Sequence, residues 1–401
     1  MDTRSKGTVL VSGASIAGPA LAYWLDRSGF RVTLVEKADG FRGGGYPIDI
    51  RGTALQVTDR MGITEQLRAA HVDTRKITFH TEAGRKLTSI RPEAISGGVQ
   101  GRDIEVPRGT LATALTGALG DGVDVLFGDS IAALDQHTDH VDVTFTSGRQ
   151  QEFDLVIGAD GLHSNTRRLA FGPEEPYHRY LGACFAGFSI PNEFGMAHEA
   201  LMWNAPGRTA SMLCPADSDT LHAFLIFQRG DPPLRAHTDP DTMRRLVADT
   251  FAGDGWHIPR MVEAMLAADD LFFDVVSQIH MPTWSQGRVA LAGDAAHATS
   301  FMSGQGSSTA LVGAYLLAGH LATHSNHTEA FTAYEQQARP FAELNQALAD
   351  EGKRILAPSA RTQFWFHNQT LRLLPLLART GIAGRKGRTA NSALDLPQFT
   401  P

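Results

Sequence analysis

The sequence is poor in cysteine, in long apolar runs and in positive charge. Its 401 residues include only Cys184 and Cys214, too few for a disulfide framework and without zinc-binding spacing. No apolar stretch reaches the roughly 18–20 residues that cross a bilayer, and the opening segment MDTRSKG contains no apolar signal region. A net charge of −7 argues against nucleic acid or an anionic membrane as the main partner. We therefore expect a cytoplasmic protein with no metal site, no nucleic acid and no membrane partner.

What is present is ordinary for a globular protein. Hydrophobic residues make up 42% of the chain and charged residues 20%. A chain of 401 residues is long for one hydrophobic core, so two lobes are expected.

The stretch from Thr8 to Glu36 has the pattern of a dinucleotide-binding βαβ unit. The apolar run at 9–11 predicts a short buried strand, and GASIAG at 13–18 predicts a tight turn followed by a helix. A second strand at 31–35 then ends on an acidic residue. This order of strand, glycine turn, helix, strand and acid is typical of dinucleotide binding.

Each part of this unit has a physical role. Gly13 permits a sharp turn, Gly18 permits close approach of helix and strand, and the helix N-terminus offers N–H groups to a pyrophosphate. Glu36, 23 residues after Gly13, is placed to accept hydrogen bonds from a ribose. Ser15 stands where the usual motif has its middle glycine. The pattern by itself leaves NAD and FAD both open.

Two later motifs each predict a buried strand that ends in Gly and Asp. DLVIGADG at 154–161 contains Asp160, and VALAGDAAH at 289–297 contains Asp294, followed by SGQG at 303–306 and a long helix. Either aspartate alone could be a strand-end cap. Because the carboxyl ends of parallel strands meet at one edge of a sheet, the glycine turn and both aspartates are expected to converge on one elongated ligand.

The other segments predict a second lobe and C-terminal helices. Residues 176–280 alternate like an antiparallel sheet rich in Phe, Trp and Met, which is either the wall of an apolar pocket or simply a core. One helix is predicted over 53–70, a hairpin over 76–91 and an amphipathic helix over 361–380. The tail 384–401 is expected to be mobile.

The three motifs, in this order, resemble those of the class A single-component FAD-dependent aromatic hydroxylases, over roughly residues 8–345. DLVIGADGLHSNTRR and RVALAGDAAH carry most of this resemblance, and the length is similar to the compact branch that includes the tetracycline-inactivating monooxygenases. The resemblance implies an α/β fold like that of p-hydroxybenzoate hydroxylase, in which a Rossmann-type FAD-binding domain is interleaved with an antiparallel-sheet substrate domain and followed by C-terminal helices. The implied boundaries are 1–72, 102–175 and 281–325 for the FAD-binding domain, 73–101 and 176–280 for the substrate-binding domain, and 326–401 for the C-terminal helical region.

The resemblance further implies non-covalent FAD, NADPH or NADH as transient reductant, and O2. The reduced flavin would pass one oxygen atom, through a C4a-hydroperoxide, to an electron-rich aromatic substrate of secondary metabolism, in a monomer or homodimer. The cofactor-binding residues implied are Gly13, Ser15, Ile16, Ala17, Gly18, Glu36, Lys37, Arg42, Asp49, Arg108, Asp160, Gly293, Asp294, Gly304, Gln305 and Gly306. Arg42 lies in a glycine-rich loop and is alternatively a plain surface residue.

The flavin would carry out most of the chemistry, and only one side chain is predicted to be catalytic. His222 is the candidate base for a phenol, and the alternative is a structural histidine on a strand. The tetracycline-inactivating branch holds its substrate with a Gln, an Arg and a His, whose matching positions here are Phe185, Ala200 and His222. An apolar phenol or polyketide is therefore favoured over tetracycline. The predicted substrate pocket comprises Phe185, Met202, Met212, His222, Phe224 and Phe301.

Three alternatives stay open. A flavin-dependent halogenase would carry W-x-W-x-I-P, of which residues 254–259 match only the second half, and these residues are better explained as a helix start with a proline in its first turn. Baeyer–Villiger oxygen insertion is open to the same flavin. A non-catalytic FAD-binding protein is the alternative from another class.

Overall fold

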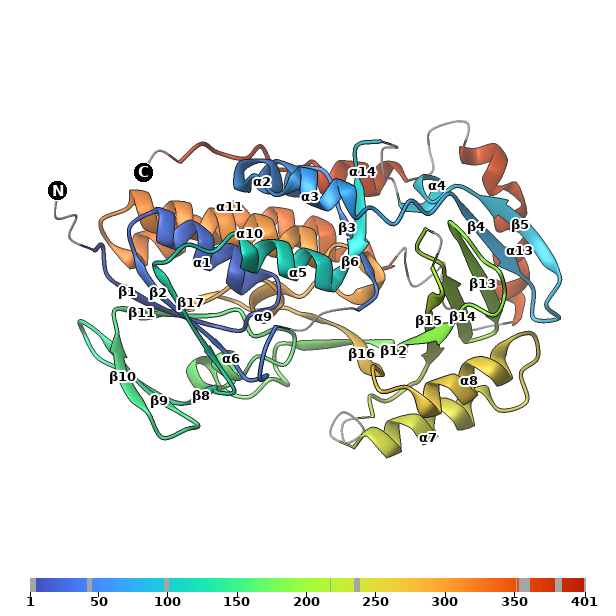
Figure 1. The fold of residues 1–401 in the computed structure, drawn as a ribbon, viewed down its shortest axis with the longest axis horizontal. Coiled ribbons are helices and arrows are strands. Elements are labelled where there is room, and N and C mark those ends of the chain that lie inside the picture. Colours follow the sequence, from blue (N-terminus) through green and yellow to red (C-terminus); the bar gives the residue numbers. More distant parts are fainter. Residues whose placement is uncertain are drawn as a thin grey trace.

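The scaffold of the protein is a six-stranded, mostly parallel sheet (Figure 1). Strand β1 lies between β2 and β11, so that Val9 has Val32 on one side and Leu155 on the other. The short edge strand β17 is antiparallel to β18. The computed structural model describes residues 5–41, 45–96, 101–216, 218–233, 239–350, 352, 361–378 and 384–399. Side by side, the strands are β17 (Ser285–Gln286), β18 (Val289–Leu291), β11 (Leu155–Gly158), β1 (Thr8–Ser12), β2 (Arg31–Glu36) and β7 (Val123–Phe127).

Helices cover one face of this sheet, and Figure 1 shows α1, α5, α10 and α11 together on that side. Val9, Val11 and Leu34 point into the same hydrophobic core as Leu21 of α1 and Leu311 of α10. The helix α10 is buried along most of its length, so it serves as the central layer between the sheet and α11. These helices are α1 (Ala17–Arg27), α5 (Arg108–Gly117), α10 (Gly306–Thr323) and α11 (His327–Gln346), with the short α9 (Asp294–His297), η2 (Phe301–Ser303) and α6 (Asn165–Phe171) at the strand ends.

A three-stranded sheet covers the other face. Leu10, Val35 and Val156 alternate with the residues that face the helices, and they pack against Val143 and Phe145. Both faces of the parallel sheet are therefore buried, which explains its continuous apolar strands. The three strands are β8 (Ile131–Gln136), β9 (Val141–Phe145) and β10 (Gln150–Phe153). The sequence of β10 is mostly polar, so no hydrophobic pattern indicates this strand.

The second lobe is a seven-stranded sheet, as predicted for residues 176–280 and the hairpin at 76–91. One face packs against α7 (Pro240–Phe251) and α8 (Ile258–Ala267), and α8 begins with Pro259 in its first turn as expected. Strand β13 joins the hairpin by parallel pairing with β4. In spatial order the strands are β16 (Phe272–Ile279), β12 (His178–Pro191), β15 (Thr220–Gln228), β14 (Arg208–Leu213), β13 (Glu199–Ala205), β4 (Lys76–His80) and β5 (Lys86–Ile90).

Between the two large sheets lies a two-stranded ribbon of β3 (Pro47–Ile50) and β6 (Ile104–Pro107). The helix predicted over 53–70 is two helices, α2 (Thr53–Met61) and α3 (Thr64–Ala69). Gly62 ends α2 in a left-handed conformation with φ of 74°, which breaks the helix. The short α4 (Glu93–Ser96) follows β5, and α13 (Arg361–Ala378) packs on both.

The expectation that the tail from Gly384 is mobile is wrong for the part that the structure describes. After α14 (Arg385–Asn391), residues 392–399 run along α2 and α10, and we call them the C-terminal strap. Arg60 donates hydrogen bonds to the carbonyls of Leu396 and Pro397, at 3.2 and 2.6 Å. The ring of Phe399 lies against Tyr315. The strap is thus part of the core of the first lobe.

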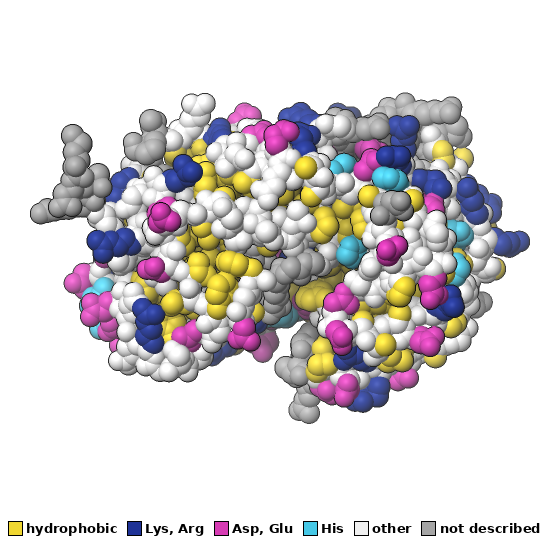
Figure 2. All heavy atoms as spheres, in the orientation of Figure 1, with side chains coloured by type: hydrophobic (Ala, Val, Ile, Leu, Met, Phe, Trp, Pro, Cys, Tyr) yellow, Lys and Arg dark blue, Asp and Glu magenta, His cyan; other side chains and the backbone are white. Residues whose placement is uncertain are grey.

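Among the helices that the structure describes, none is long and apolar enough to cross a membrane. On the face drawn in Figure 2, the described acidic and basic side chains are interspersed rather than separated by sign.

Candidate functional site

The glycine turn at the end of β1 is built for close approach. Gly13 has φ of +103°, a left-handed value that favours glycine, and its N–H donates to the carbonyl of Val35 at 2.8 Å. A Cβ on Gly18 would lie 1.8 Å from the carbonyl oxygen of Gly13, so only glycine fits this position in α1. Ile16 and Ala17, which open α1, are buried. The first turn of α1 therefore sits tightly on the end of β1.

Glu36, the last residue of β2, binds the backbone at this turn. The carboxylate of Glu36 accepts hydrogen bonds from the N–H groups of Ala14 at 2.9 Å and Ala38 at 3.0 Å. Lys37 follows and is exposed. Arg42, predicted to bind the cofactor, lies outside the described residues.

Arg108 connects the glycine turn with the middle of the site. It is the first residue of α5, and its guanidinium donates to Oγ of Ser15 at 2.7 Å. Its backbone N–H donates to the carbonyl of Tyr46 at 3.1 Å. The same positive charge opposes the rise of the pKa of Asp294 that burial causes. Arg108 thus lies between the glycine turn and α9 and interacts with both.

Asp294 and the Gly304–Gly306 turn meet at the N-terminus of α10. Gly293 has φ of 60°, and a Cβ there would lie 2.9 Å from Cβ of Ala17, so this strand end also needs glycine. A Cβ on Gly306 would lie 3.7 Å from Oδ1 of Asp294. Gln305 is 2% exposed, and its Oε1 has no hydrogen-bond partner among the described residues. The N-terminus of α10, which no side chain caps, therefore adjoins a buried amide oxygen that has no partner among the described residues.

Asp49 lies beside the Gly304–Gly306 turn, at the end of this row of residues away from the glycine turn. Its Oδ2 lies 4.0 Å from the position that a Cβ on Gly304 would occupy. Its carbonyl accepts from Oγ of Ser308, in the first turn of α10, at 3.4 Å. The structure therefore brings the glycine turn, Arg108, Asp294, the Gly304–Gly306 turn and Asp49 into one elongated site.

Asp160 has its carboxylate turned to its own helix. The oxygens accept from Oγ of Ser164 and from both the N–H and the hydroxyl of Thr166, each of the last two at 2.9 Å. This is the strand-end capping arrangement that the sequence left open as the alternative for an isolated aspartate.

An aromatic cluster lies beside this line, on the face of the seven-stranded sheet opposite α7 and α8. Phe185 and Phe301 stack with ring centroids 4.2 Å apart, and Phe224 and Tyr46 meet edge to face at 5.4 Å. Phe272 contacts both Phe185 and Tyr46. Tyr46 and Phe272 were missed in the sequence, where nothing distinguishes them from core residues. We call these five residues the aromatic cluster.

The three other residues predicted to line the substrate pocket lie outside the aromatic cluster. His222 borders the aromatic cluster and lines a cavity of about 40 Å³ with Tyr46 and Phe224, and burial lowers the pKa of His222. Met202 shares that face but packs against Phe79, Ile90 and Leu371. Met212 points to the opposite face, into the core under α7 and α8. The structure does not bring Met212 together with the other pocket residues.

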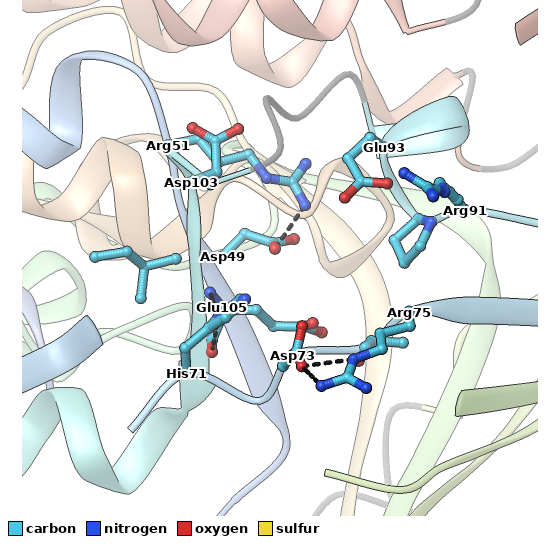
Figure 3. A pocket seen from close by; sticks show the side chains of 13 residues that line it. Asp49, Arg51, His71, Asp73, Arg75, Arg91, Glu93, Asp103 and Glu105 are labelled. Carbon is cyan, nitrogen blue, oxygen red and sulfur yellow. Dashed lines mark hydrogen bonds and ion pairs between the residues drawn. The ribbon is translucent and has the colours of Figure 1, made fainter. Parts of the chain in front are cut away.

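A larger cavity of about 370 Å³ opens where β3 and β6 face the seven-stranded sheet (Figure 3). Asp49 lines it, so it adjoins the elongated site. Arg51 pairs with Asp49, and Arg75 donates to Asp73 at 2.7 Å. We call this space the charged cavity. Its lining, unpredicted apart from Asp49, is Asp49, Arg51, His71, Asp73, Thr74, Arg75, Arg91, Pro92, Glu93, Gly101, Asp103, Ile104 and Glu105.

Comparison with known proteins gives a consistent result. A family model described as FAD binding domain matches residues 6–349. A protein named flavin-dependent monooxygenase, from an unknown prokaryotic organism, is 39% identical over 339 residues, covering 84% of this chain and 87% of the relative. The crystal structure of tetracycline destructase Tet(55) is similar with a TM-score of 0.84 and 34% identity, over 100% of both chains. Klebsiella pneumoniae HpxO, solved with FAD and uric acid, shares the fold with a TM-score of 0.72 and 22% identity, over 94% of this chain and 97% of that one.

Proposed function

The chain belongs to the FAD binding domain family and is a flavin-dependent monooxygenase, and from this premise we propose that it hydroxylates an apolar phenol or polyketide-like aromatic compound with O2 and NADPH or NADH. The observation that carries the proposal is the aromatic cluster at the side of the elongated site. We further propose that the FAD-binding and substrate-binding domains follow the boundaries predicted from the sequence. We also propose that the enzyme is cytoplasmic and acts as a monomer or a homodimer.

The residues of the elongated site fit FAD. The crowded glycine turn supports an ADP moiety close to the backbone, and Glu36 is placed for its ribose. Arg108, beside Ser15, supplies a cation for the pyrophosphate. Gln305, whose buried Oε1 lacks a partner among the described residues, and the open N–H groups of α10 suit the polar edge of a flavin ring. Asp160 would act indirectly, by fixing α6.

Once bound, the flavin supplies the redox chemistry and the activation of oxygen. The protein provides the surroundings. The N-terminus of α10, with no acidic residue in its first turn, stabilises negative charge that develops nearby. The aromatic cluster excludes water and holds the substrate ring.

His222 is proposed to take the phenol proton. Burial lowers the pKa of His222, so its imidazole is neutral and able to accept a proton at neutral pH. We expect His222→Asn to slow the oxidation of phenols by roughly 10- to 100-fold, whereas His137→Asn, at an exposed histidine on the hairpin between β8 and β9, should leave it unchanged.

A tetracycline is the second candidate substrate, because Tet(55) is similar over its whole length. The cluster argues against it. Phe185 and Ala200 offer no hydrogen bonds where that branch has a Gln and an Arg, and Phe185 is stacked on Phe301. A halogenase is not supported, since Trp256 and Ile258 are at the start of α8, on the other face of the sheet.

The test is to follow the visible flavin spectrum of the holoenzyme during anaerobic NADPH addition, with phenols, polyketides, ketones and tetracycline, and then to analyse the aerobic products by mass. Faster bleaching with a phenol or polyketide, and a hydroxylated product, is the expected result. Preferred turnover of tetracycline would overturn the substrate proposal, and oxygen insertion beside a ketone would give the Baeyer–Villiger alternative. Bound flavin that NADPH and NADH both fail to reduce would indicate a halogenase or a non-catalytic FAD-binding protein.

A further inference from the structure

The charged cavity is explained neither by the elongated site nor by the aromatic cluster. In Figure 3 the side chains of Asp49, Glu93 and Glu105 point from different sides toward the same space. At about 370 Å³ the cavity is at the small end of ligand pockets, so it suits a side group of a ligand rather than a fused ring system. Asp49 belongs to both, so the cavity adjoins the elongated site.

The cavity contains more carboxylates than cations. Two of its three arginines already face carboxylates, since Arg51 pairs with Asp49 and Arg75 with Asp73. An incoming anion would therefore meet two arginines that already face carboxylates, in a lining where five acidic side chains outnumber three arginines. The ionisable side chains of the lining are the acids Asp49, Asp73, Glu93, Asp103 and Glu105, the bases Arg51, Arg75 and Arg91, and His71.

His71 does not change this balance. Nδ1 of His71 lies within hydrogen-bond distance of both the backbone N–H and the backbone carbonyl of Glu105, at 3.0 and 3.1 Å. Even when His71 is counted with the bases, the five acidic side chains outnumber the four basic ones. With its carboxylates ionised the cavity has a net negative charge.

We propose that the charged cavity binds a protonated amine carried by the aromatic substrate, so that the ammonium group lies among the carboxylates while the ring lies at the aromatic cluster. This inference rests on the proposed function. Strand β3 connects the two places: Tyr46 of the aromatic cluster immediately precedes the strand, and Asp49 of the cavity lies three residues after Tyr46. At the rise of a β-strand this is a separation of about 10 Å.

Glu105 gives the binding a pH dependence. Burial, with a smaller contribution from the negative charge of Asp49, raises the pKa of Glu105 to about 7, against the lowering effects of Thr74 and Arg51; Glu93 raises it slightly further. A bound ammonium favours the ionised carboxylate. The affinity for an amine should therefore increase as the pH rises through 7 and level off above it, while an alkylammonium stays protonated over this range.

The experiment compares 4-(ω-aminoalkyl)phenols of two to six methylenes with 4-alkylphenols of the same length. Their dissociation constants are measured on the holoenzyme from the change in flavin absorbance, at pH 6 and pH 8. We expect the amines to bind about 10- to 100-fold more tightly than the neutral phenols once the chain is long enough to span β3. The shortest amine should show no gain, and the gain should be larger at pH 8.

Glu105→Gln should remove the pH dependence and most of the gain, whereas Glu152→Gln, the same change at an exposed glutamate on β10, should retain both. If Glu105→Gln does not fold, the length series on the unaltered protein decides the question. Amines that bind no better than alkylphenols at any length, or a gain that persists in Glu105→Gln, would overturn the proposal. If no phenol binds or speeds NADPH oxidation, the proposed function itself fails; if neutral phenols do so and amines gain nothing, only the cavity proposal fails.

Discussion

Gly18→Ala is the sharpest test of the glycine turn. The added methyl group would lie 1.8 Å from the carbonyl oxygen of Gly13, and the two atoms would have to separate by about 1.6 Å more to reach an ordinary 3.4 Å contact. Overpacking of this kind costs about 1–3 kcal/mol even where the neighbours give way. This cost exceeds the stabilisation of about 0.5–1 kcal/mol that alanine gives relative to glycine inside a helix. The first turn of α1 must move away from β1, and with it the N–H groups that face the proposed pyrophosphate.

We therefore expect Gly18→Ala to lower the thermal unfolding temperature and to weaken FAD binding at least about tenfold, because hydrogen bonds fail once donor and acceptor separate beyond about 3.5 Å. Gly117→Ala is the matched control. Gly117 is also helical, at the end of α5, but a Cβ there meets nothing within 4 Å. The Gly117→Ala protein should bind FAD with unchanged affinity and be slightly more stable than the unaltered protein. Differential scanning fluorimetry and a fluorescence titration of FAD measure both quantities. A Gly18→Ala protein with unchanged FAD affinity and stability would refute the reasoning.

Three further predictions follow from the structure. Arg108→Ala should weaken FAD binding by about 10- to 100-fold in a fluorescence titration, since it removes the charged donor at 2.7 Å from Ser15; an unchanged affinity would contradict its assignment. Burial lowers the pKa of His297 to about 4, below the pKa of a histidine in the unfolded chain. The contribution of the neutral His297 to stability is therefore full above pH 6.5 and is lost as the pH falls toward 4. His297→Leu should reduce the change in the free energy of unfolding over this pH range, measured by urea unfolding, by up to about 3 kcal/mol. Phe399→Ala should cost about 1–2 kcal/mol of stability in urea unfolding, because the ring is only half-buried, whereas Phe366→Ala, at a ring 65% exposed, should cost almost nothing.

The parts of the fold that were predicted from the sequence depend on local pattern. The βαβ unit and the strand that ends at Gly158 have apolar runs, glycines and turn residues within a few positions of each other, and the structure confirms these elements. The convergence of strand ends was predictable for the same reason, since parallel strands share a direction.

The failures concern properties that no local pattern encodes. Which face Met212 occupies depends on its pairing with Ala223 of β15, because neighbouring residues of a strand point to opposite faces. The C-terminal strap depends on partners such as Arg60 that are far away in sequence. The charged cavity is formed by four separate segments, so its carboxylates are invisible as a group until the chain has folded.

The strand order of the parallel sheet constrains how this protein acquires its cofactor during synthesis. The central strand β1 is made first, but its neighbour β11 and the next strand β18 come from the middle and the last third of the chain. The N-terminus of α10 and the C-terminal strap come later still. Contacts between residues so distant in sequence form slowly. A ribosome-bound chain that lacks β18 and α10 has only half of the proposed flavin site. We therefore expect FAD to bind at the end of folding, after the greater part of the polypeptide has been made.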